Sequence, residues 1–489
     1  MKVKQGNKKP SSFSLLIDFY QLTMAQGYWQ AGLENKEAIF HLFFRNAPFK
    51  GGFALSAGLQ NVIDYLNYPP FDKSDIRYLA SLKKEGKYYF CPKFLHYLSE
   101  LKWSLTIEAV VEGRVVFAHE PLMRVQGPLI QCQLLESALL NLTNFSTLIA
   151  TKAARICLAA KEAPVLEFGL RRAPGRDGAL TASRSAYIGG CAFTSNLMAA
   201  KQLGIPVSGT HSHSWVMAFE EEITAFQAFA SSSSSSPIFL VDTYQTMNGV
   251  KKAIQVGKWL KKQGKELAGI RLDSGDLVAL SQSCRQLLDE AGFLQTKIVA
   301  SNDLDEYEIY HLKAKGAKID VWAVGTNLVT AKDDAALNGV YKLSALRNLG
   351  EPWRYTIKLS EQIAKTSTPG LLQVKRFYKN GQPFADCIYD EAKQLPAQLN
   401  YIDLSNGSSS VIDKVNQPSE ELLTSIFKQG EQVYESPDLK KIKESAQKEL
   451  ALFRLEAAHL FEPFQYTIGM ERSLFNEKQR MIEHTKNFQ

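Results

Sequence analysis

Short apolar runs that alternate with helical patterns constrain the fold of this chain more than any other feature of its sequence. The runs are partly β-branched and lie in the middle of the chain, at residues 163–168, 238–241, 268–270, 298–300 and 319–324. Buried parallel strands have this composition, and strands that alternate with helices are typical of a parallel α/β fold. The sequence therefore predicts an α/β barrel over residues 129–338.

Polar residues interrupt the apolar pattern in three places. The polar stretches are residues 167–196, residues 272–276 and residues 209–215, which read Gly-Thr-His-Ser-His-Ser-Trp. In an α/β barrel the residues just after each strand converge on the catalytic face. We therefore expect the three stretches to contribute to one active site.

The length of the chain predicts further regions on both sides of the barrel. A chain of 489 residues exceeds what one hydrophobic core usually contains. Residues 1–128 mix helical and strand-like segments and are expected to form an N-terminal α/β domain. Residues 339–489 contain short strands, turns and finally charged helical stretches at residues 439–460 and 474–486. We expect this C-terminal region to pack on the N-terminal domain.

Composition argues against several classes of function. The net charge is +7, and the basic residues are scattered among acidic ones, so no nucleic-acid partner is expected, whereas a small anionic substrate is compatible. The six cysteines form no CxxC pair, as in a cytoplasmic protein with reduced thiols. We find no targeting segment and no membrane span. The serine run at residues 231–236 is predicted to lie in a solvated loop.

Three turns and an arginine pair are candidates for binding a phosphorylated ligand. Residues 301–305 and 324–327 each follow a late predicted strand, which is the usual place of the phosphate site in a barrel. The turn at residues 272–276 can bind an anion or accept from sugar hydroxyls, although Asp and Ser there are equally compatible with a simple helix cap. Arg171 and Arg172 follow the strand predicted at residues 163–168, and guanidinium groups suit phosphate and carboxylate.

Two histidines lie in the polar stretch at residues 209–215. His211 and His213 are two residues apart, but no third ligand occurs at a recognisable spacing, so zinc is not expected. Neutral imidazole attacks phosphorus readily, which makes His213 a candidate nucleophile. The residues alone indicate a barrel enzyme that handles a phosphorylated sugar.

These same stretches resemble the nicotinate phosphoribosyltransferase family, and the resemblance covers nearly the whole chain. Each motif is ordinary by itself, but their order is highly specific. The matching segments are residues 18–24, 40–45, 167–173, 194–196, 209–215, 239–244, 271–276, 300–306, 339–343 and 472–475. The resemblance implies an irregular TIM-like α/β barrel of the type II phosphoribosyltransferase kind. It also implies transfer of phosphoribosyl from phosphoribosyl pyrophosphate (PRPP) to nicotinate, coupled to ATP hydrolysis, in the salvage route to NAD.

The family resemblance also implies roles for individual residues. His213 is expected to be phosphorylated by ATP, and Asp273 is expected to accept hydrogen bonds from the ribose. Arg171 is expected to hold phosphate or pyrophosphate. Mg²⁺ is expected to accompany the pyrophosphate. Phe168 is expected to sandwich the pyridine ring together with Tyr20 from the other subunit of a homodimer. The other expected substrate-binding residues are Arg172, Thr194, Ser195, Arg271, Ser274 and Gly275, with Ser301, Asn302, Gly325 and Thr326 at the 5′-phosphate.

Two alternatives remain open at this point. A nicotinamide-specific enzyme would resemble this chain in fold and in the histidine motif, but that relative has Asp at the position aligned with Ser195, where it can accept from a carboxamide. A carboxylate there would repel nicotinate, whereas Ser would not. A non-catalytic phosphosugar-binding protein is the second alternative, because a fold alone does not establish chemistry.

Overall fold

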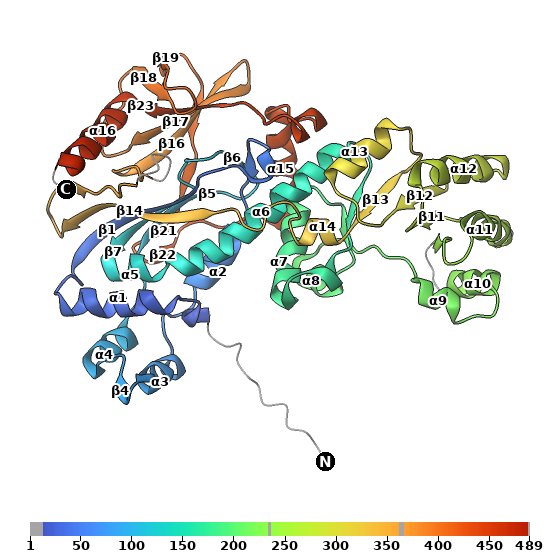
Figure 1. Cartoon of the computed structure of the whole chain (residues 1–489), viewed down its shortest axis with the longest axis horizontal. Helices are drawn as coiled ribbons and strands as arrows, with labels where there is room; N and C mark the ends of the chain where they lie inside the picture. The colour runs from blue at the N-terminus through green and yellow to red at the C-terminus, as the bar shows by residue number, and fades with distance from the viewer. Residues whose placement is uncertain (1–12, 233–235, 361–365, 488–489) are drawn as a thin grey trace. The chain divides into compact units, whose positions relative to one another are not determined.

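The chain forms two compact units, each built from discontinuous segments. The structure, a computed structural model, describes residues 13–232, 236–360 and 366–487 (Figure 1). The first unit groups the described residues up to Phe145 with those of Ala336–Pro437 and Gln465–Gln489, and the second contains Ser146–Ala335 and Asp438–Phe464.

The second unit contains the predicted parallel sheet. Its six strands pair in parallel in the order β10-β11-β12-β13-β8-β9. Their bounds are β8 (Val165–Glu167), β9 (Phe193–Thr194), β10 (Ile238–Leu240), β11 (Gly269–Leu272), β12 (Lys297–Ala300) and β13 (Val321–Val324). Trp322, Phe239 and Ile270 are fully buried. These strands are covered on both faces, which is why their sequences are apolar. The predicted α/β class is confirmed.

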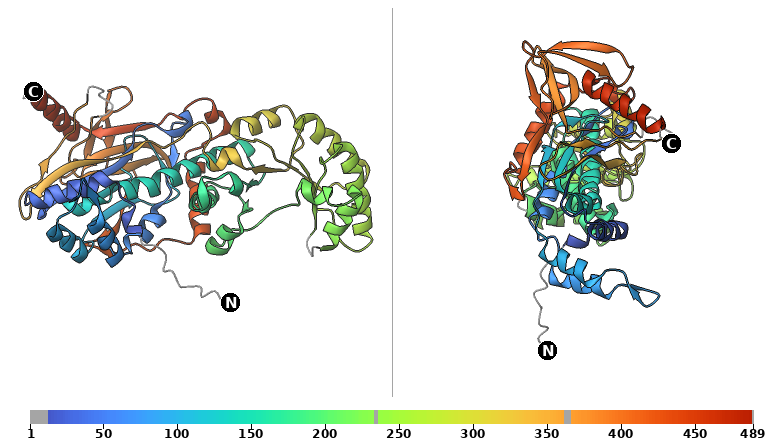
Figure 2. Two further views of the ribbon diagram at one scale, coloured as in Figure 1. Left: turned by 60° about the horizontal axis from the view of Figure 1, so that its bottom comes forward. Right: turned by 90° about the vertical axis from the view of Figure 1, so that its left-hand side faces the viewer.

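Helices connect the strands of the second unit. Their bounds are α6 (Glu136–Ala160), which begins in the first unit, α7 (Gly175–Ile188), α8 (Leu197–Leu203), α9 (His213–Met217), α10 (Glu222–Ser232), α11 (Thr246–Lys261), α12 (Leu277–Glu290), α13 (Glu306–Ala314), α14 (Thr326–Val329) and α15 (Leu439–Leu452). Between α8 and α9 the chain runs as a long irregular segment (Figures 1 and 2). That segment begins beside β9, where Val207 forms a parallel bridge with Thr194.

The first unit is built on a seven-stranded sheet and a six-stranded sheet, whose strand orders are β15-β14-β1-β7-β5-β21-β22 and β19-β18-β23-β17-β16-β20. The strands are β1 (Lys36–Phe44), β2 (Ala54–Leu55), β3 (Lys83–Lys84), β4 (Lys87–Tyr88), β5 (Thr106–Val110), β6 (Val115–Val116), β7 (Met123–Pro128), β14 (Gly339–Asn348), β15 (Arg354–Tyr355), β16 (Leu372–Lys379), β17 (Gln382–Asp390), β18 (Gln398–Asp403), β19 (Ser409–Asp413), β20 (Ser419–Glu421), β21 (Leu423–Lys428), β22 (Glu431–Gln432) and β23 (Thr467–Glu471). The helices are α1 (Phe19–Gln30), α2 (Leu59–Leu66), α3 (Lys73–Ser81), α4 (Pro92–Glu100), α5 (Leu129–Leu134) and α16 (Arg472–Asn487).

The units divide the chain differently from the three predicted regions. The prediction assigned all of residues 339–489 to one region, whereas Asp438–Phe464 group with the parallel sheet. Within that segment α15 packs on α7, and Leu460 accepts a hydrogen bond from the Arg155 guanidinium of α6 at 3.3 Å. The boundary predicted at residue 129 also lies earlier than the boundary near Ser146, since α6 continues through it.

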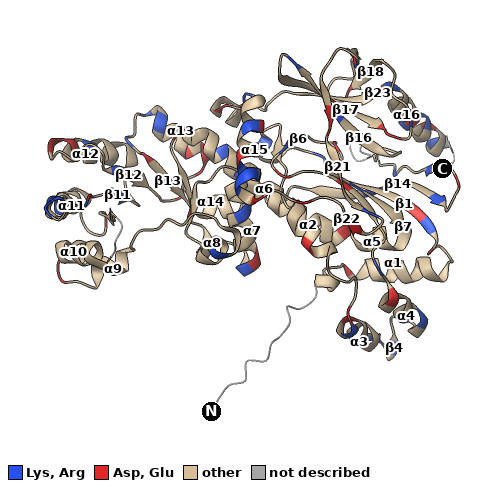
Figure 3. Cartoon of the chain, turned by 180° about the vertical axis from the view of Figure 1, so that it is seen from behind, with Lys and Arg blue, Asp and Glu red and all other residues tan. Residues whose placement is uncertain are grey.

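The structure can be compared with what composition predicted about charge, membrane spans, cysteines and the serine run. Lys and Arg, and Asp and Glu, are scattered over both units (Figure 3). None of the described helices is both long and apolar enough to cross a bilayer. All six cysteines are free thiols. Ser231 and Ser232 end α10, and the rest of the predicted serine loop lies largely outside the described residues.

Candidate active site

Glu167, the last residue of β8, organises one wall of the site. Its buried carboxylate accepts hydrogen bonds from the Gly169 backbone N–H at 2.5 Å, from the Ser183 hydroxyl at 2.8 Å and from the Thr194 hydroxyl at 2.5 Å. A Cβ at Gly169 would lie 2.2 Å from Val329, so the chain can approach α14 only with glycine there. The chain just after β8 is therefore held in place by these hydrogen bonds and by its close approach to α14.

The short 3₁₀ helix Leu170–Arg172 follows this turn and carries the predicted arginine pair. Arg171 and Arg172 are both exposed and line the cavity described below. Within the described residues neither guanidinium forms an ion pair, so both are available to an anionic ligand.

His213 is the first residue of α9 and lies between two strand ends. Its Nδ1 is 3.2 Å from the Thr243 hydroxyl oxygen, and its Nε2 is 3.6 Å from Asp273 Oδ2. Thr243 follows β10 and Asp273 follows β11, as the strand-end rule predicts. The His213 side chain is 42% exposed, which leaves its ring accessible from the cavity.

Asp273 joins the histidine to Arg271 and Ser301. Its Oδ1 accepts from Arg271 Nη2 at 2.7 Å and from the Ser301 hydroxyl, while Arg271 Nη1 donates to the Thr210 hydroxyl oxygen at 3.0 Å. Burial acts to raise the pKa of the Asp273 carboxyl, but the Ser301 hydrogen bond and the Arg271 charge outweigh it and hold that pKa below its ordinary value. Asp273 is therefore a carboxylate at neutral pH.

Asp242 shapes the turn that follows β11. Its Oδ2 accepts from the Asp273 backbone N–H at 2.7 Å and from the Ser274 hydroxyl at 2.8 Å. Its Oδ1 is buried and has no hydrogen-bond partner among the described residues. Since the Asp273 N–H is already bonded to Asp242, it is not free for an anion.

The two turns predicted to bind phosphate lie beside each other. Asn327 Nδ2 donates to the carbonyl oxygens of Asp303 and Leu304, at 2.7 and 3.1 Å, and so fastens the turn after β12 to the turn after β13. Asn302 has φ 96°, a conformation that Asn tolerates better than most residues. A Cβ at Gly325 would lie 3.1 Å from the Phe168 carbonyl oxygen, so the two chain segments pass closely there.

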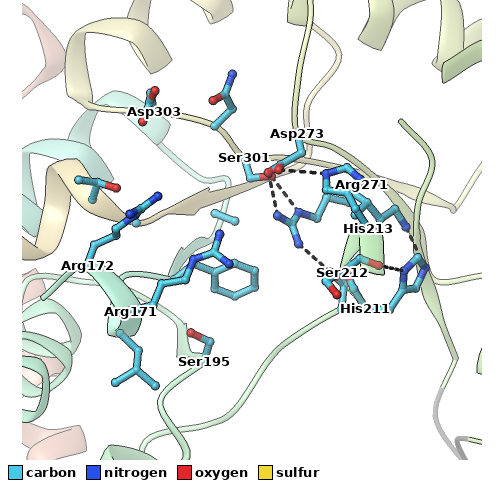
Figure 4. A pocket seen from close by; sticks show the side chains of 18 residues that line it. Arg171, Arg172, Ser195, His211, Ser212, His213, Arg271, Asp273, Ser301 and Asp303 are labelled. Carbon is cyan, nitrogen blue, oxygen red and sulfur yellow. Dashed lines mark hydrogen bonds and ion pairs between the residues drawn. The ribbon is translucent and has the colours of Figure 1, made fainter. Parts of the chain in front are cut away.

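These residues surround one cavity of about 540 Å³, a size typical of small-molecule sites. Arg171 and Arg172 lie on one side of it, and His213, Arg271 and Asp273 on the other (Figure 4). All three predicted polar stretches contribute to the cavity. Its lining is Phe168, Leu170, Arg171, Arg172, Ser195, Thr210, His211, Ser212, His213, Leu240, Arg271, Asp273, Ser301, Asn302, Asp303, Ala323, Gly325 and Thr326.

Four predicted site residues are not part of this lining. Thr194 is buried, and its hydroxyl bonds to Glu167. Ser274 donates to Asp242, and both Ser274 and Gly275 are exposed in the turn outside the cavity lining. Tyr20 belongs to α1 of the first unit, where its side chain is 48% exposed.

The sequence prediction missed several residues that organise the site. Glu167, Asp242 and Thr243 hold its turns or contact His213, and Thr210 accepts from Arg271. Asp242 and Thr243 lie two and three residues after the end of β10, so the same strand-end rule that selected Asp273 points to them.

Comparison with known proteins assigns the chain to a family. The models of the nicotinate phosphoribosyltransferase (NAPRTase) N-terminal domain, family and C-terminal domain match residues 15–144, 164–382 and 372–478. Nicotinate phosphoribosyltransferase of Bacillus subtilis (strain 168) is 40% identical over 486 residues, which cover 98% of this chain and 97% of the relative. The chain belongs to the nicotinate phosphoribosyltransferase family. The Homo sapiens member is 33% identical, over 94% of this chain and 95% of its own.

Solved structures agree with this assignment. The crystal structure of human nicotinic acid phosphoribosyltransferase matches with a TM-score of 0.82 and 30% identity, over 96% of this chain and 100% of that chain. Nicotinate-nucleotide pyrophosphorylase from Pyrococcus furiosus shares the fold at a TM-score of 0.69 and 21% identity. The expected type II phosphoribosyltransferase fold is therefore confirmed.

Proposed function

We propose that this member of the nicotinate phosphoribosyltransferase family transfers phosphoribosyl from PRPP to nicotinate, giving nicotinate mononucleotide and pyrophosphate in NAD salvage. The observation that carries the proposal is the convergence of an arginine pair, a carboxylate, a histidine and two phosphate turns on one cavity. The pyridine nitrogen attacks the anomeric carbon as pyrophosphate leaves, so the protein mainly positions the substrates and neutralises charge.

The cavity supplies a partner for each part of the substrates. Ser301, Asn302, Gly325 and Thr326 would hold the 5′-phosphate, and Asp273 would accept from ribose hydroxyls. The pyrophosphate would bind to Arg171 and Arg172. Arg271 lies 5.8 Å from the ring centroid of Phe168, which supports a place for the pyridine ring near both.

We also propose that ATP phosphorylates His213 and that this step drives the transfer. The ring nitrogen attacks the γ-phosphorus of ATP, the bond from that phosphorus to the β,γ-bridging oxygen breaks, and ADP leaves with the electron pair. The Thr243 hydroxyl at Nδ1 and the Asp273 carboxylate near Nε2 hold the imidazole between them. The protein would then act as a ligase, with ATP hydrolysed in each cycle.

Mg²⁺ is expected with the pyrophosphate, although no group of three or more His, Cys, Asp or Glu side chains among the described residues is arranged to hold an ion by itself. Asp273 and Asp303 line the cavity, and carboxylate oxygens are ligands that Mg²⁺ prefers. The ion would therefore be bound mainly by the pyrophosphate itself, with one carboxylate of the cavity as a further ligand, and would neutralise negative charge on the leaving group.

A substrate comparison tests the proposed function. The protein is incubated with PRPP, Mg²⁺ and ATP, and either nicotinate or nicotinamide is offered. We expect nicotinate mononucleotide, pyrophosphate and ADP from nicotinate, with much less product from nicotinamide. Preference for nicotinamide would favour the nicotinamide-specific alternative, and no product from either would favour a non-catalytic phosphosugar-binding protein.

Replacing Ser195 by Asp is expected to impair nicotinate use selectively. Ser195 lines the cavity just after β9, so a carboxylate there would face the carboxylate of nicotinate. Like charges in a partly dry pocket cost on the order of 1 to 3 kcal/mol, or roughly 5- to 150-fold in the KM for nicotinate. Ser195→Asn is the neutral control of the same size as Asp. An unchanged KM for nicotinate in Ser195→Asp would remove this residue from the nicotinate site.

Mixing two variants that are each expected to lack ATP-coupled transfer tests the shared active site of the proposed homodimer. If Tyr20 completes the ring sandwich in the partner's cavity, Tyr20→Ala subunits mixed with His213→Ala subunits should recover part of the activity. Each mixed dimer then has one site with both residues intact. With subunit exchange verified, a mixture that stays as inactive as its components would show that Tyr20 does not act across subunits.

A further inference from the structure

β10 is an edge strand of the parallel sheet in the second unit. One side of β10 pairs with β11, and the Leu240 backbone N–H points to the other side. Leu240 is 1% exposed, so this N–H needs a hydrogen-bond partner inside the protein. The partner is a side chain: Leu240 N–H donates to His211 Nε2 at 3.1 Å.

The segment that contains His211 leaves the opposite edge of the sheet. Pro206 and Ser208 exchange backbone hydrogen bonds with Thr194 of β9, at 3.0 and 3.1 Å. Within the described ranges, residues 209–211 make no backbone hydrogen bond to a strand. The segment is fastened to β10 by the His211 ring, and to β11 by the Arg271 hydrogen bond to Thr210.

The hydrogen bonds of His211 define its protonation state. Because Nε2 accepts from Leu240 N–H, it carries no proton, and Nδ1–H donates to the Ser212 carbonyl at 3.3 Å. Burial lowers the pKa of His211 and outweighs the hydrogen bond to the Ser212 carbonyl, which raises that pKa, while the charges of Arg271 and His213 lower it further. The imidazole is neutral, with its proton on Nδ1.

Aromatic rings enclose His211 on several sides. The centroid of the Phe229 ring is 4.9 Å away in an edge-on arrangement, and those of Phe226 and Phe239 are 5.9 and 6.3 Å away. His211 therefore has two distinguishable properties, a packed ring and a hydrogen-bond acceptor.

The hydrogen bond that His211 Nε2 accepts also bears on the orientation of His213. Two residues after His211, the chain places His213 against Thr243 and Asp273, which follow the same two strands, β10 and β11, to which the segment is fastened. We infer that His211 is a positioning residue: its Nε2 fixes the 209–213 segment to the free edge of β10 and thereby aims the His213 imidazole for phosphorylation. This inference rests on the proposed role of His213 as the phosphoryl acceptor.

Two substitutions separate the acceptor from the ring. His211→Phe keeps an aromatic ring among Phe226, Phe229 and Phe239 but leaves the Leu240 N–H unpaired, whereas His211→Gln replaces the ring but keeps an oxygen acceptor. We expect His211→Phe to lower the rate at which labelled ATP phosphorylates His213 by about tenfold or more. The reason is that the buried Leu240 N–H loses its acceptor, so the segment that carries His213 is no longer fixed to β10. His211→Gln should be phosphorylated faster than His211→Phe, even if it unfolds at a lower temperature.

A packing variant provides the matched control. Phe229→Leu loosens the aromatic surroundings without touching the acceptor, so it should lower the melting temperature and leave the phosphorylation rate within about twofold of wild type, as expected when only apolar contact is lost. Phosphorylation of His211→Phe at the wild-type rate would overturn the inference. So would rates that simply follow the melting temperatures of the three variants. Absence of phosphoenzyme in the wild type would instead refute the phosphohistidine step itself.

Discussion

Replacing His213 by Ala is expected to abolish both protein phosphorylation by ATP and PRPP-dependent ATP hydrolysis. The wild-type protein, incubated with γ-labelled ATP, should carry a phosphate that is stable in base, labile in acid and discharged when nicotinate mononucleotide forms. The His213→Ala variant should keep a slow transfer that does not depend on ATP, because Arg171 and the turns after β12 and β13 remain in place. ATP-coupled transfer should fall by roughly 10³-fold or more, as for loss of other covalent nucleophiles.

His211 supplies the control for this experiment. His211 is 6% exposed and its Nε2 already accepts from Leu240, so this ring is not available to ATP. His211→Ala should therefore still become labelled, although more slowly than wild type. Labelling that survives in His213→Ala and disappears in His211→Ala would identify the other histidine as the acceptor.

The sequence located the strands well because their burial leaves a simple pattern. β8, β10 and β13 lie inside the predicted apolar runs, since strands covered on both faces are apolar throughout. The amphipathic pattern of the sequence also predicts a helix over residues 130–142. The structure has α5 and then α6 there, and α6 continues to Ala160 because its later turns are buried on several faces. Lys152 and Arg155 are fully buried there, so the alternation of polar and apolar residues that marks a helix in sequence is lost.

A backbone feature interrupts the helical stretch predicted at residues 439–460. The structure ends α15 at Leu452, places Arg454 in the left-handed region at φ 50° and resumes with a 3₁₀ turn, Ala457–Leu460. No glycine or proline marks the break, so the local sequence gives no signal for it.

The sequence could place the site but could not tell which side chains face the cavity. Asp273 and Ser274 are neighbours in one turn, yet only Asp273 lines the cavity, whereas Ser274 bonds to Asp242. In the same way His211 and His213 stand in equivalent contexts, Thr-His-Ser and Ser-His-Ser. Their surroundings differ, because the folded chain encloses the ring of His211 among phenylalanines and leaves the ring of His213 accessible.

Asp273→Asn is expected to lower kcat/KM for PRPP by about 100-fold while the protein stays folded. One oxygen of Asp273 accepts from Arg271 and Ser301, and the amide oxygen of Asn can keep these bonds. The second oxygen, 3.6 Å from His213 Nε2, becomes an NH₂ group, which cannot accept from a ribose hydroxyl and carries no charge beside the developing oxocarbenium ion. A hundredfold loss corresponds to about 2.7 kcal/mol, within the range for removing one preorganised electrostatic contact.

Asp276→Asn is the matched control for this variant because it makes the same chemical change three residues away. The Asp276 side chain accepts from the backbone N–H groups of Val278 and Ala279 and caps α12, and Asn is an equally good cap. Asp276 does not line the cavity, so its variant should keep wild-type kcat/KM. Equal activities of the two variants would mean that the Asp273 carboxylate is not needed for PRPP, and the ribose contact would then have to come from another group in the cavity.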